Sequence, residues 1–252
     1  MKKLSDYFGQ NIDQKRIIIT GGTTGIGKVT AELLVSLGGR VFIFGRNVED
    51  FNCAINEIKK NYPKGEIYGT TADITIKEDI EKILKMVESD LGGIDILINN
   101  AALPADGIND GIFEDYKYVI DTNITGYLAF TEEAVSTMKE QKSGHIINIG
   151  SMSAETKGPT STIYVATKAA IRGFSTSLRK EINPLGIKVS LIEPGAVTSD
   201  MQSGTRKEHQ EKIDKMEMLE AEDIAMSVVF CLSQPKRCDI VTLQIRPHLQ
   251  II

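Results

Sequence analysis

The feature that most constrains this chain is a regular alternation of short apolar runs with longer amphipathic segments. The apolar runs are continuous and rich in β-branched residues, as is typical of parallel strands that are covered on both faces. They predict strands at residues 16–20, 40–44, 66–71, 94–98, 145–149, 187–192 and 239–245. Helical spacing predicts helices at 25–37, 48–61, 76–91, 162–183 and 222–232, and one long helix or two over 115–142.

Strict alternation predicts an α/β fold whose parallel strands are joined by right-handed crossovers. We therefore expect a doubly wound, Rossmann-type sheet of about seven strands with helices on both faces. No repeat, low-complexity tract or linker interrupts the pattern, so residues 1–252 are predicted to form a single domain. The longest predicted irregular stretch, residues 196–220, is polar and of mixed charge, and it is long enough for a mobile substrate flap.

Composition argues against several classes of protein. The 252 residues are 41% hydrophobic and 25% charged with a net charge of −5, which does not suggest nucleic-acid binding. The three cysteines and three histidines lack the spacing of a disulfide framework or metal motif, so we expect no metal and a reducing, cytoplasmic setting. The polar N-terminus lacks a signal-peptide core, and no run of 18 apolar residues predicts a membrane span.

Polar and glycine residues follow the carboxyl end of almost every predicted strand. Along the chain they are Gly21, Gly25 and Gly27 after the first strand, then Arg46, Asp73, Asn99–Asn100, Ser151 and Pro194–Gly195 after the next five. Open parallel sheets bind their ligands at this edge, so six such groups around one rim predict a built site.

The first of these turns has the spacing of a phosphate-binding loop. Residues 20–27 read T-G-G-T-T-G-I-G. Glycines allow a tight turn and a close approach of a pyrophosphate, and the helix that follows presents free N–H groups and its positive dipole end. Glycines after a strand can also form a turn without binding anything.

Several motifs together resemble the short-chain dehydrogenase/reductase family, over about residues 15–246. They are T-G-x-x-x-G-x-G from Thr20, N-N-A-A from Asn99, T-N-I-T-G with Asn123, I-I-N-I-G-S ending at Ser151, Y-x-x-x-K with Tyr164 and Lys168, and E-P-G-A-V-T-S-D-M from Glu193. The chain departs from the family's N-N-A-G by carrying Ala102 in place of the glycine. The resemblance implies an NAD(P)-dependent oxidoreductase that interconverts an alcohol and a carbonyl.

Tyr164 and Lys168 are four residues apart, so they share one face of a helix. An adjacent ammonium favours the phenolate, and we expect Lys168, in a partly desolvated cleft and helped by the positive charge of the oxidised nicotinamide, to lower the pKa of Tyr164 so that it works as the proton-transfer group. By resemblance, Ser151 donates a hydrogen bond to the substrate oxygen, and Asn123 holds a water that connects Lys168 to solvent. Ser153 competes with Ser151, although the thirteen-residue separation from Tyr164 favours Ser151.

The alternative for Tyr164 and Lys168 is a surface pair without a catalytic role, and the alternative for Asn123 is an irregularity in a helix. A further alternative is a dinucleotide-sensing regulator without catalysis. The presence of Asn123, Ser151, Tyr164 and Lys168 together disfavours it.

The resemblance also implies a cofactor site. Its expected residues are Gly21, Thr23, Thr24, Gly25, Ile26, Gly27, Arg46, Asp73, Ile74, Asn100, Ala101, Ala102, Tyr164, Lys168, Pro194, Gly195 and Val197. Asp73 is expected to bind the adenine amine. An arginine after the second strand can grip a 2′-phosphate, so Arg46 predicts NADP(H), with NAD(H) as the alternative and a solvated or adenine-stacking arginine left open.

The substrate is less well defined by the sequence. The C-terminal segment resembles a subgroup of NADP-dependent reductases that includes 3-hydroxy acid dehydrogenases, which favours a small polar substrate; Ile163 and Met201 are expected near it.

The predicted helix 162–183 carries small residues that permit close helix packing: Ala166, Ala169, Ala170 and Gly173. The family uses this helix in a dimer interface, so we expect a homodimer or homotetramer; close packing within one subunit is the alternative.

Overall fold

The computed structural model describes residues 12–159, 161–198 and 204–250. Its centre is a seven-stranded sheet in the order β3-β2-β1-β4-β5-β6-β7, and every neighbouring pair is parallel. The strands are β1 (Arg16–Thr20), β2 (Arg40–Gly45), β3 (Glu66–Thr71), β4 (Ile96–Asn99), β5 (Gly144–Ile149), β6 (Ile187–Pro194) and β7 (Thr242–Ile245). The predicted α/β class, parallel topology and strand number are confirmed.

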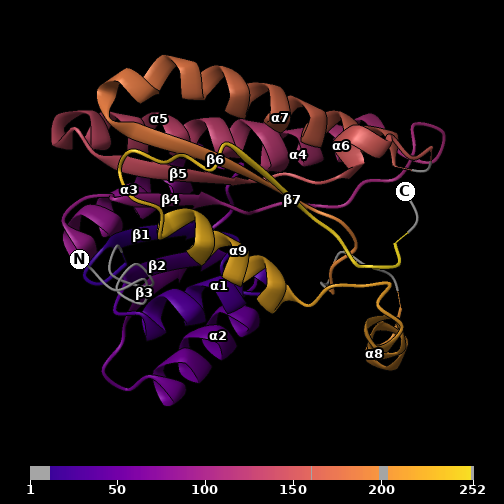
Figure 1. Ribbon diagram of the computed structural model, residues 1–252, viewed down its shortest axis with the longest axis horizontal. Helices are drawn as coiled ribbons and strands as arrows, with labels where there is room; N and C mark the ends of the chain where they lie inside the picture. Colours follow the sequence, from indigo (N-terminus) through magenta and orange to yellow (C-terminus); the bar gives the residue numbers. More distant parts are fainter. Residues whose placement is uncertain (1–11, 160, 199–203, 251–252) are drawn as a thin grey trace.

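Helices cover both faces of the sheet, as predicted. They are α1 (Gly25–Ser36), α2 (Val48–Asn61), α3 (Lys77–Leu91), α4 (Phe113–Ile120), α5 (Gly126–Gln141), α6 (Ser153–Thr156), α7 (Thr162–Ile182), α8 (Arg206–Asp214) and α9 (Ala221–Leu232). Figure 1 shows α1, α2 and α9 on one side of the sheet and α4, α5 and α7 on the other.

The alternation of side chains along each strand explains the two layers. In β1, Ile17 and Ile19 join the apolar cluster under α1, α2 and α9, whereas Ile18 joins the cluster on the opposite face with α3, α5 and α7. All three isoleucines are fully buried. A strand covered on both faces must be apolar at every position, and this is why the strands appear in the sequence as continuous runs.

Two strand boundaries differ from the prediction for identifiable reasons. β4 starts at Ile96 instead of residue 94, because the chain bends at Asp95, whose carboxylate accepts two side-chain hydrogen bonds from Arg16. β6 extends to Pro194, because Glu193 and Pro194 are paired with Gln244 and Ile245 of β7. The last strand is correspondingly shorter than the predicted 239–245.

The segment predicted as one helix or two is one helical path with a wider turn inside it. The π-helical turn η2 (Asp121–Thr125) lies between α4 and α5, and residues on either side keep right-handed helical backbone angles. Asn123 lies in the middle of this turn. Single π turns inside α-helices are frequent at functional sites.

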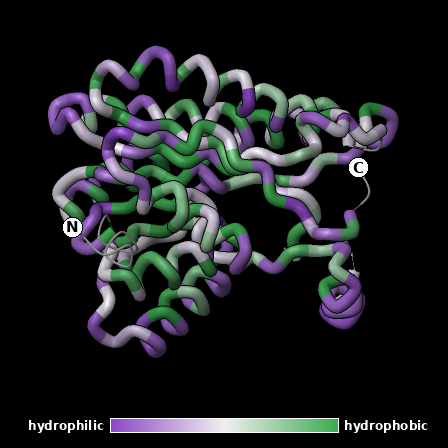
Figure 2. The backbone as a smooth tube through the Cα atoms, viewed as in Figure 1, coloured by the Kyte–Doolittle hydropathy of each residue, from purple (hydrophilic) through white to green (hydrophobic). Residues whose placement is uncertain are grey.

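The predicted flap is partly ordered, which corrects the expectation of an irregular segment. It contains α8, whose start is fixed by a capping box in which Thr205 and Glu208 bond each other's backbone N–H groups. The helix is strongly hydrophilic and stands apart from the sheet (Figures 1 and 2). Residues 199–203, including Met201, lie outside the described residues, and flap mobility stays a prediction.

Candidate active site

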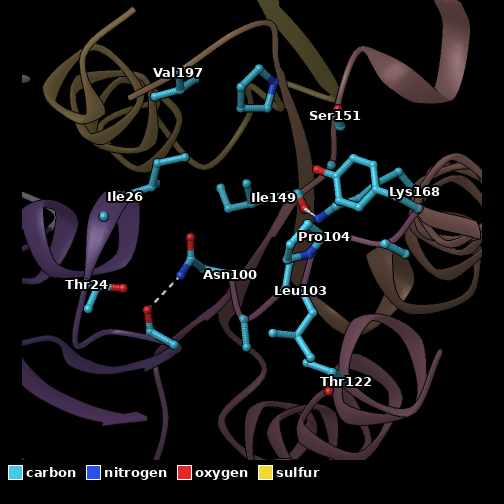
Figure 3. Close-up of a pocket in the computed structure, with 18 of the residues that line it drawn as sticks. Thr24, Ile26, Asn100, Leu103, Pro104, Thr122, Ile149, Ser151, Lys168 and Val197 are labelled. Carbon is cyan, nitrogen blue, oxygen red and sulfur yellow. Dashed lines mark hydrogen bonds between the residues drawn. The ribbon is translucent and has the colours of Figure 1, made fainter. Parts of the chain in front are cut away.

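A cleft of about 1440 Å³ opens at the carboxyl edge of the sheet. It is lined by residues that follow β1, β2, β3, β4, β5 and β6, as the topology of a doubly wound sheet requires. Figure 3 shows Thr24 and Ile26 on one wall, Ser151 and Lys168 on the other, and Asn100 and Ile149 between them. Its size exceeds the range of about 300–1,000 Å³ typical of sites for one small ligand.

The glycine loop between β1 and α1 is folded too tightly for side chains. A Cβ on Gly21 would lie 2.8 Å from the Ala101 Cα, and one on Gly27 would lie 2.2 Å from the carbonyl oxygen of Gly21. Gly21 also has a positive φ of 63°. The Asn100 amide donates to the carbonyl oxygens of Thr20 and Gly21 at 3.0 and 2.9 Å, which ties this loop to β4.

The start of α1 fits an anionic group. Its N-cap residue, Thr24, makes no side-chain capping bond, and Thr24, Gly25 and Ile26 all line the cleft. The N–H groups of a first helical turn have no partner within the helix, and the helix dipole favours negative charge there. The loop therefore suits the phosphates of a dinucleotide.

Three of the four predicted catalytic residues line the same cleft: Ser151 after β5, and Tyr164 and Lys168 on α7. The Lys168 ammonium nitrogen lies 5.7 Å from the centroid of the Tyr164 ring and donates to the carbonyl oxygen of Ile149 at 2.9 Å. Lys168 is only 2% exposed, and this burial lowers the pKa of its ammonium to about 8. Tyr164 and Lys168 therefore face one site, as predicted from their spacing.

In the protein without a cofactor, Lys168 alone does not lower the pKa of Tyr164. Burial raises the pKa of the phenol above its ordinary value, and a hydrogen bond with Ser151 opposes part of that rise. The physical reason is distance and direction, because the ammonium of Lys168 is turned toward the carbonyl of Ile149. The neutral phenol is thus the stable form of Tyr164 in the protein alone.

Asn123 is fully buried and does not line the cleft. Its amide oxygen accepts from the Leu103 N–H at 2.7 Å, and its amide nitrogen donates to the Leu103 carbonyl at 2.9 Å and the Thr167 hydroxyl at 3.2 Å. Asn123 therefore holds the segment after β4 against α7. The competing serine, Ser153, also lines the cleft, and its N–H donates to the Ser151 hydroxyl.

Most of the predicted cofactor residues line the cleft, and two do not. Those that line it are Gly21, Thr23, Thr24, Gly25, Ile26, Arg46, Ile74, Asn100, Ala101, Ala102, Tyr164, Lys168, Pro194, Gly195 and Val197. Gly27 lies behind the loop, against Gly21. The Asp73 carboxylate is turned to Thr75, from which it accepts bonds to N–H and hydroxyl, and to the Tyr118 hydroxyl.

The cleft also contains residues that the sequence did not single out. They are chiefly Leu103, Pro104, Ala105 and Asp106 after β4, Thr122 beside Asn123, Met152, Thr156 and Ser161 around α6, and Gln250 near the C-terminus. The buried Thr122 hydroxyl has no hydrogen-bond partner in the described residues, and its place next to Asn123 was the available signal. Gln250 carried no signal, because only folding brings it to the Ala196 N–H. Ile163 does not line the cleft.

Comparison with known proteins agrees with this geometry. Residues 15–210 match the short chain dehydrogenase family. The chain belongs to this family. An uncharacterized oxidoreductase of Staphylococcus aureus (strain USA300) is 35% identical over 237 residues, which cover 94% of this chain and 98% of that protein. A counterpart in Staphylococcus epidermidis is also 35% identical, with the same coverage.

Solved structures show the same architecture. A short-chain type dehydrogenase/reductase from Mycobacterium ulcerans superposes with a TM-score of 0.84 at 22% identity, covering 93% of this chain and 89% of that one, and illustrates the shared fold. A metagenomic short-chain oxidoreductase in complex with NADP superposes with a TM-score of 0.81 at 25% identity, covering 95% and 100% of the two chains.

In this short-chain dehydrogenase, an ion pair supports the Pro194–Gly195 wall of the cleft from behind. The Glu193 carboxylate is completely buried and receives two hydrogen bonds of 2.7 Å from the Arg172 guanidinium on α7. Arg172 also bonds Glu155 of α6 at 2.9 Å. One arginine thus links the helix that carries Tyr164 and Lys168 to both β6 and the segment after Ser151.

Two further findings concern the described residues alone. They contain no group of three or more potential metal-binding side chains. Across these residues, no helix has both the length and the apolar composition needed to span a membrane.

Proposed function

We propose that this oxidoreductase interconverts a secondary alcohol and a carbonyl on a small polar substrate with NADP(H), through Tyr164, Lys168, Ser151 and Asn123. One observation carries the proposal: Ser151, Tyr164 and Lys168 share a cleft with the uncapped start of α1. This arrangement supports a reaction in which proton-transfer groups would face a cofactor whose phosphates lie at the other wall of the same cleft. The fold and family are consistent with that chemistry.

The cofactor would be held along the length of the cleft. The turn from Gly21 to Ile26 would bind the pyrophosphate, Arg46 a 2′-phosphate, and Pro194–Gly195 with Val197 the nicotinamide end. When bound, the nicotinamide supplies or accepts a hydride. NADP in the metagenomic relative supports the same cofactor here. NAD(H) is the alternative, and a role for Asp73 at the adenine stays a prediction.

Tyr164 would hold the transferred proton on its phenol oxygen. Because burial favours the neutral phenol, Tyr164 is suited to donate that proton to a carbonyl oxygen. Ser151, which shares the cleft with Tyr164, would donate a second hydrogen bond to the same oxygen and stabilise its developing charge. For alcohol oxidation the proton moves back to Tyr164, which requires a phenolate stabilised by the Lys168 ammonium and by the positive charge of the oxidised nicotinamide.

Asn123 would act by position instead of by contact with the substrate. Its side-chain amide is fully used by Leu103 and Thr167. These bonds fix Leu103 at the cleft wall and keep α7 in register with the segment after β4. The water relay from Lys168 to solvent stays a prediction.

The described lining of the cleft favours a polar, uncharged substrate. Ser153, Thr156 and Ser161 contribute hydroxyl groups around Tyr164, and Asp106 contributes a carboxylate. Apart from Lys168, the only basic side chain in this described lining is Arg46, which is placed for the cofactor. A hydroxylated carbonyl compound fits these groups better than a carboxylate.

A screen of purified protein tests this proposal. NADPH and NADH would each be offered with ketones, aldehydes, hydroxylated carbonyl compounds, oxo acids and quinones, and oxidation of the nicotinamide followed by absorbance. Turnover with NADPH that disappears in Tyr164→Phe supports it. NADPH binding without turnover of any carbonyl class, in either direction, would favour the sensing regulator.

We also propose that the protein assembles as a homodimer or homotetramer in the cytoplasm. Ala166, Ala169 and Ala170 form an exposed small-residue face on α7, and a side chain at Gly173 would meet nothing within 4 Å. Such a face permits close approach of a second copy of the helix. A monomer by light scattering, or an oligomer unchanged by Gly173→Arg, would contradict this interface.

The three cysteines are free, which fits a reducing compartment, and cell fractionation tests the location.

A further inference from the structure

Three polar side chains meet at the β2–β3 side of the cleft, across β1 and β4 from β5, the strand that precedes Ser151. Arg46 follows β2, Asp73 follows β3, and Tyr118 comes from α4. The Arg46 guanidinium donates to the Tyr118 hydroxyl, which donates in turn to the Asp73 carboxylate, each at 2.5 Å. The Arg46 guanidinium carbon also lies 5.4 Å from the centre of the Tyr118 ring. Tyr118 thus adds a side-chain bridge between the segments after β2 and β3, which are already joined by the bond from the Ala72 N–H to the Gly45 carbonyl at 3.0 Å.

The arrangement leaves the charge of Arg46 without a direct counter-ion. Within the described ranges, Arg16, Arg40 and Arg172 each pair with a carboxylate, whereas Arg46 forms no ion pair. A carboxylate in direct contact would neutralise the guanidinium and repel an incoming phosphate. A phenol oxygen accepts a hydrogen bond and adds no charge. Arg46 is therefore oriented while keeping its capacity to bind an anion.

The direction of the hydrogen bonds is fixed from the other end. The Asp73 carboxylate accepts from the Thr75 N–H and hydroxyl at 2.9 and 2.8 Å, so its orientation is set by its own turn. A carboxylate held in this way accepts a hydrogen bond from the Tyr118 hydroxyl. The lone pairs of the phenol oxygen then face Arg46. The backbone of the turn after β3 thereby determines where the Arg46 guanidinium lies.

We propose that Tyr118 is a positioning residue that sets the preference for NADP(H) over NAD(H) by holding Arg46 in place for the 2′-phosphate. This inference rests on the proposed function. A long, exposed arginine loses conformational entropy when it binds a ligand, and prior orientation reduces that loss. The effect requires a 2′-phosphate, so Tyr118 contributes to NADPH binding and not to NADH binding.

Tyr118→Phe tests the proposal, because it removes the hydroxyl and keeps the ring beside Arg46. The dissociation constants of NADPH and NADH would be measured by nicotinamide fluorescence, without substrate. Loss of one hydrogen bond of ordinary strength predicts NADPH binding weakened about fivefold and NADH binding unchanged. In turnover, the loss appears in KM for NADPH and not in kcat. Tyr116→Phe is the matched control, because its hydroxyl, on the same helix, bonds the Ile108 carbonyl instead.

A double-mutant cycle with Arg46→Met decides whether Tyr118 acts through Arg46. If it does, Tyr118→Phe has no further effect on NADPH binding in the Arg46→Met background. An equal weakening of NADPH and NADH, or a persistent effect without Arg46, would overturn the proposal. Failure of the wild type to prefer NADPH, or of Arg46→Met to reduce that preference, would instead contradict the proposed cofactor.

Discussion

The two ends of the cleft hold their charges in opposite ways. At the catalytic end, Lys168 is 2% exposed and the Glu193 carboxylate behind the wall is 0% exposed. At the opposite rim, Arg46 is exposed and Tyr118 is half-buried. A buried charge depends on fixed protein partners, whereas an exposed one is screened by water and salt. We infer that the buried end determines whether the reaction occurs, and the exposed end determines which cofactor is preferred.

The titration behaviour of the two ends shows the same contrast. At the catalytic end, burial dominates, and it lowers the pKa of Lys168 and raises the pKa of Tyr164. At the rim, burial tends to raise the pKa of Asp73, but hydrogen bonds from Tyr118 and Thr75 and the charge of Arg46 lower it overall. Desolvation therefore favours neutral groups at one end, and hydrogen bonding preserves the charged ones at the other.

The largest expected effect is that of Tyr164→Phe at the buried end. Removing the proton-transfer group should reduce kcat about 10³-fold, because general acid–base catalysis contributes on the order of 10²–10⁴. NADPH binding should persist, since the phenol oxygen is remote from the glycine loop. Single-turnover oxidation of NADPH and a fluorescence titration measure the two quantities. A kcat within a factor of a few of wild type would remove Tyr164 from the mechanism.

The next effect concerns stability at the same end. Arg172→Met leaves the Glu193 carboxylate buried without a cation, and loss of one partner of a buried pair costs about 3–5 kcal/mol. We expect about 3 kcal/mol, because the Arg172 side chain is itself 33% exposed. Denaturant unfolding gives the free energy of unfolding.

A companion variant separates the pair from simple packing. In Arg172→Met/Glu193→Leu no charge remains buried, so most of the lost stability should return. If the loss of stability in the double variant equalled the sum of the losses in Arg172→Met and Glu193→Leu measured separately, the cost would come from packing and not from the unpaired carboxylate.

The contrast between the ends also explains how much the sequence could predict. The parallel strands and both helical layers follow from periodicity, and the meeting of Ser151, Tyr164 and Lys168 follows from motif spacing and the family resemblance; these are local properties of the sequence. Tyr118, Gln250 and Arg172 belong to no motif, and only packing brings each of them to its partner, Arg46, the Ala196 N–H and Glu193 respectively. The raised pKa of Tyr164 in the protein without a cofactor could not be predicted for the same reason, because spacing along a helix does not reveal where an ammonium points.

At the exposed rim, Arg46→Asp should weaken NADPH binding about 10- to 100-fold, which corresponds to the loss of one or more charge-assisted hydrogen bonds. NADH binding should weaken little or improve, since a carboxylate there can accept from ribose hydroxyls. The wild-type preference for NADPH should also decrease with added salt. Titrations at low and high ionic strength check both effects. Unchanged NADPH binding would mean that Arg46 is a solvated side chain without a role in recognition.

The smallest expected effect is a pH dependence of stability that only the buried end should show. The Lys168 pKa is about 8 in the folded protein against an ordinary value of 10.5. Between those values the unfolded chain holds the proton and the folded protein does not, so the free energy of unfolding contributed by Lys168 rises with pH. Below pH 8 both forms hold the proton, and the folded protein bears the full cost of burying it. Relative to Lys168→Met, wild type should therefore gain about 1–2 kcal/mol between pH 7.5 and 9.5.

Denaturant midpoints of both proteins across this range measure the difference, and Arg46→Met is the matched control at the exposed rim. Burial raises the pKa of Tyr127 and of Cys231 in the folded protein, and any contribution from their titration in the unfolded chain is common to all three proteins and cancels in the comparison. Because Arg46 is exposed, its variant should parallel wild type. If wild type and Lys168→Met kept a constant difference in stability, the Lys168 ammonium would be reaching water, and the distinction drawn here between a buried and an exposed end would fail.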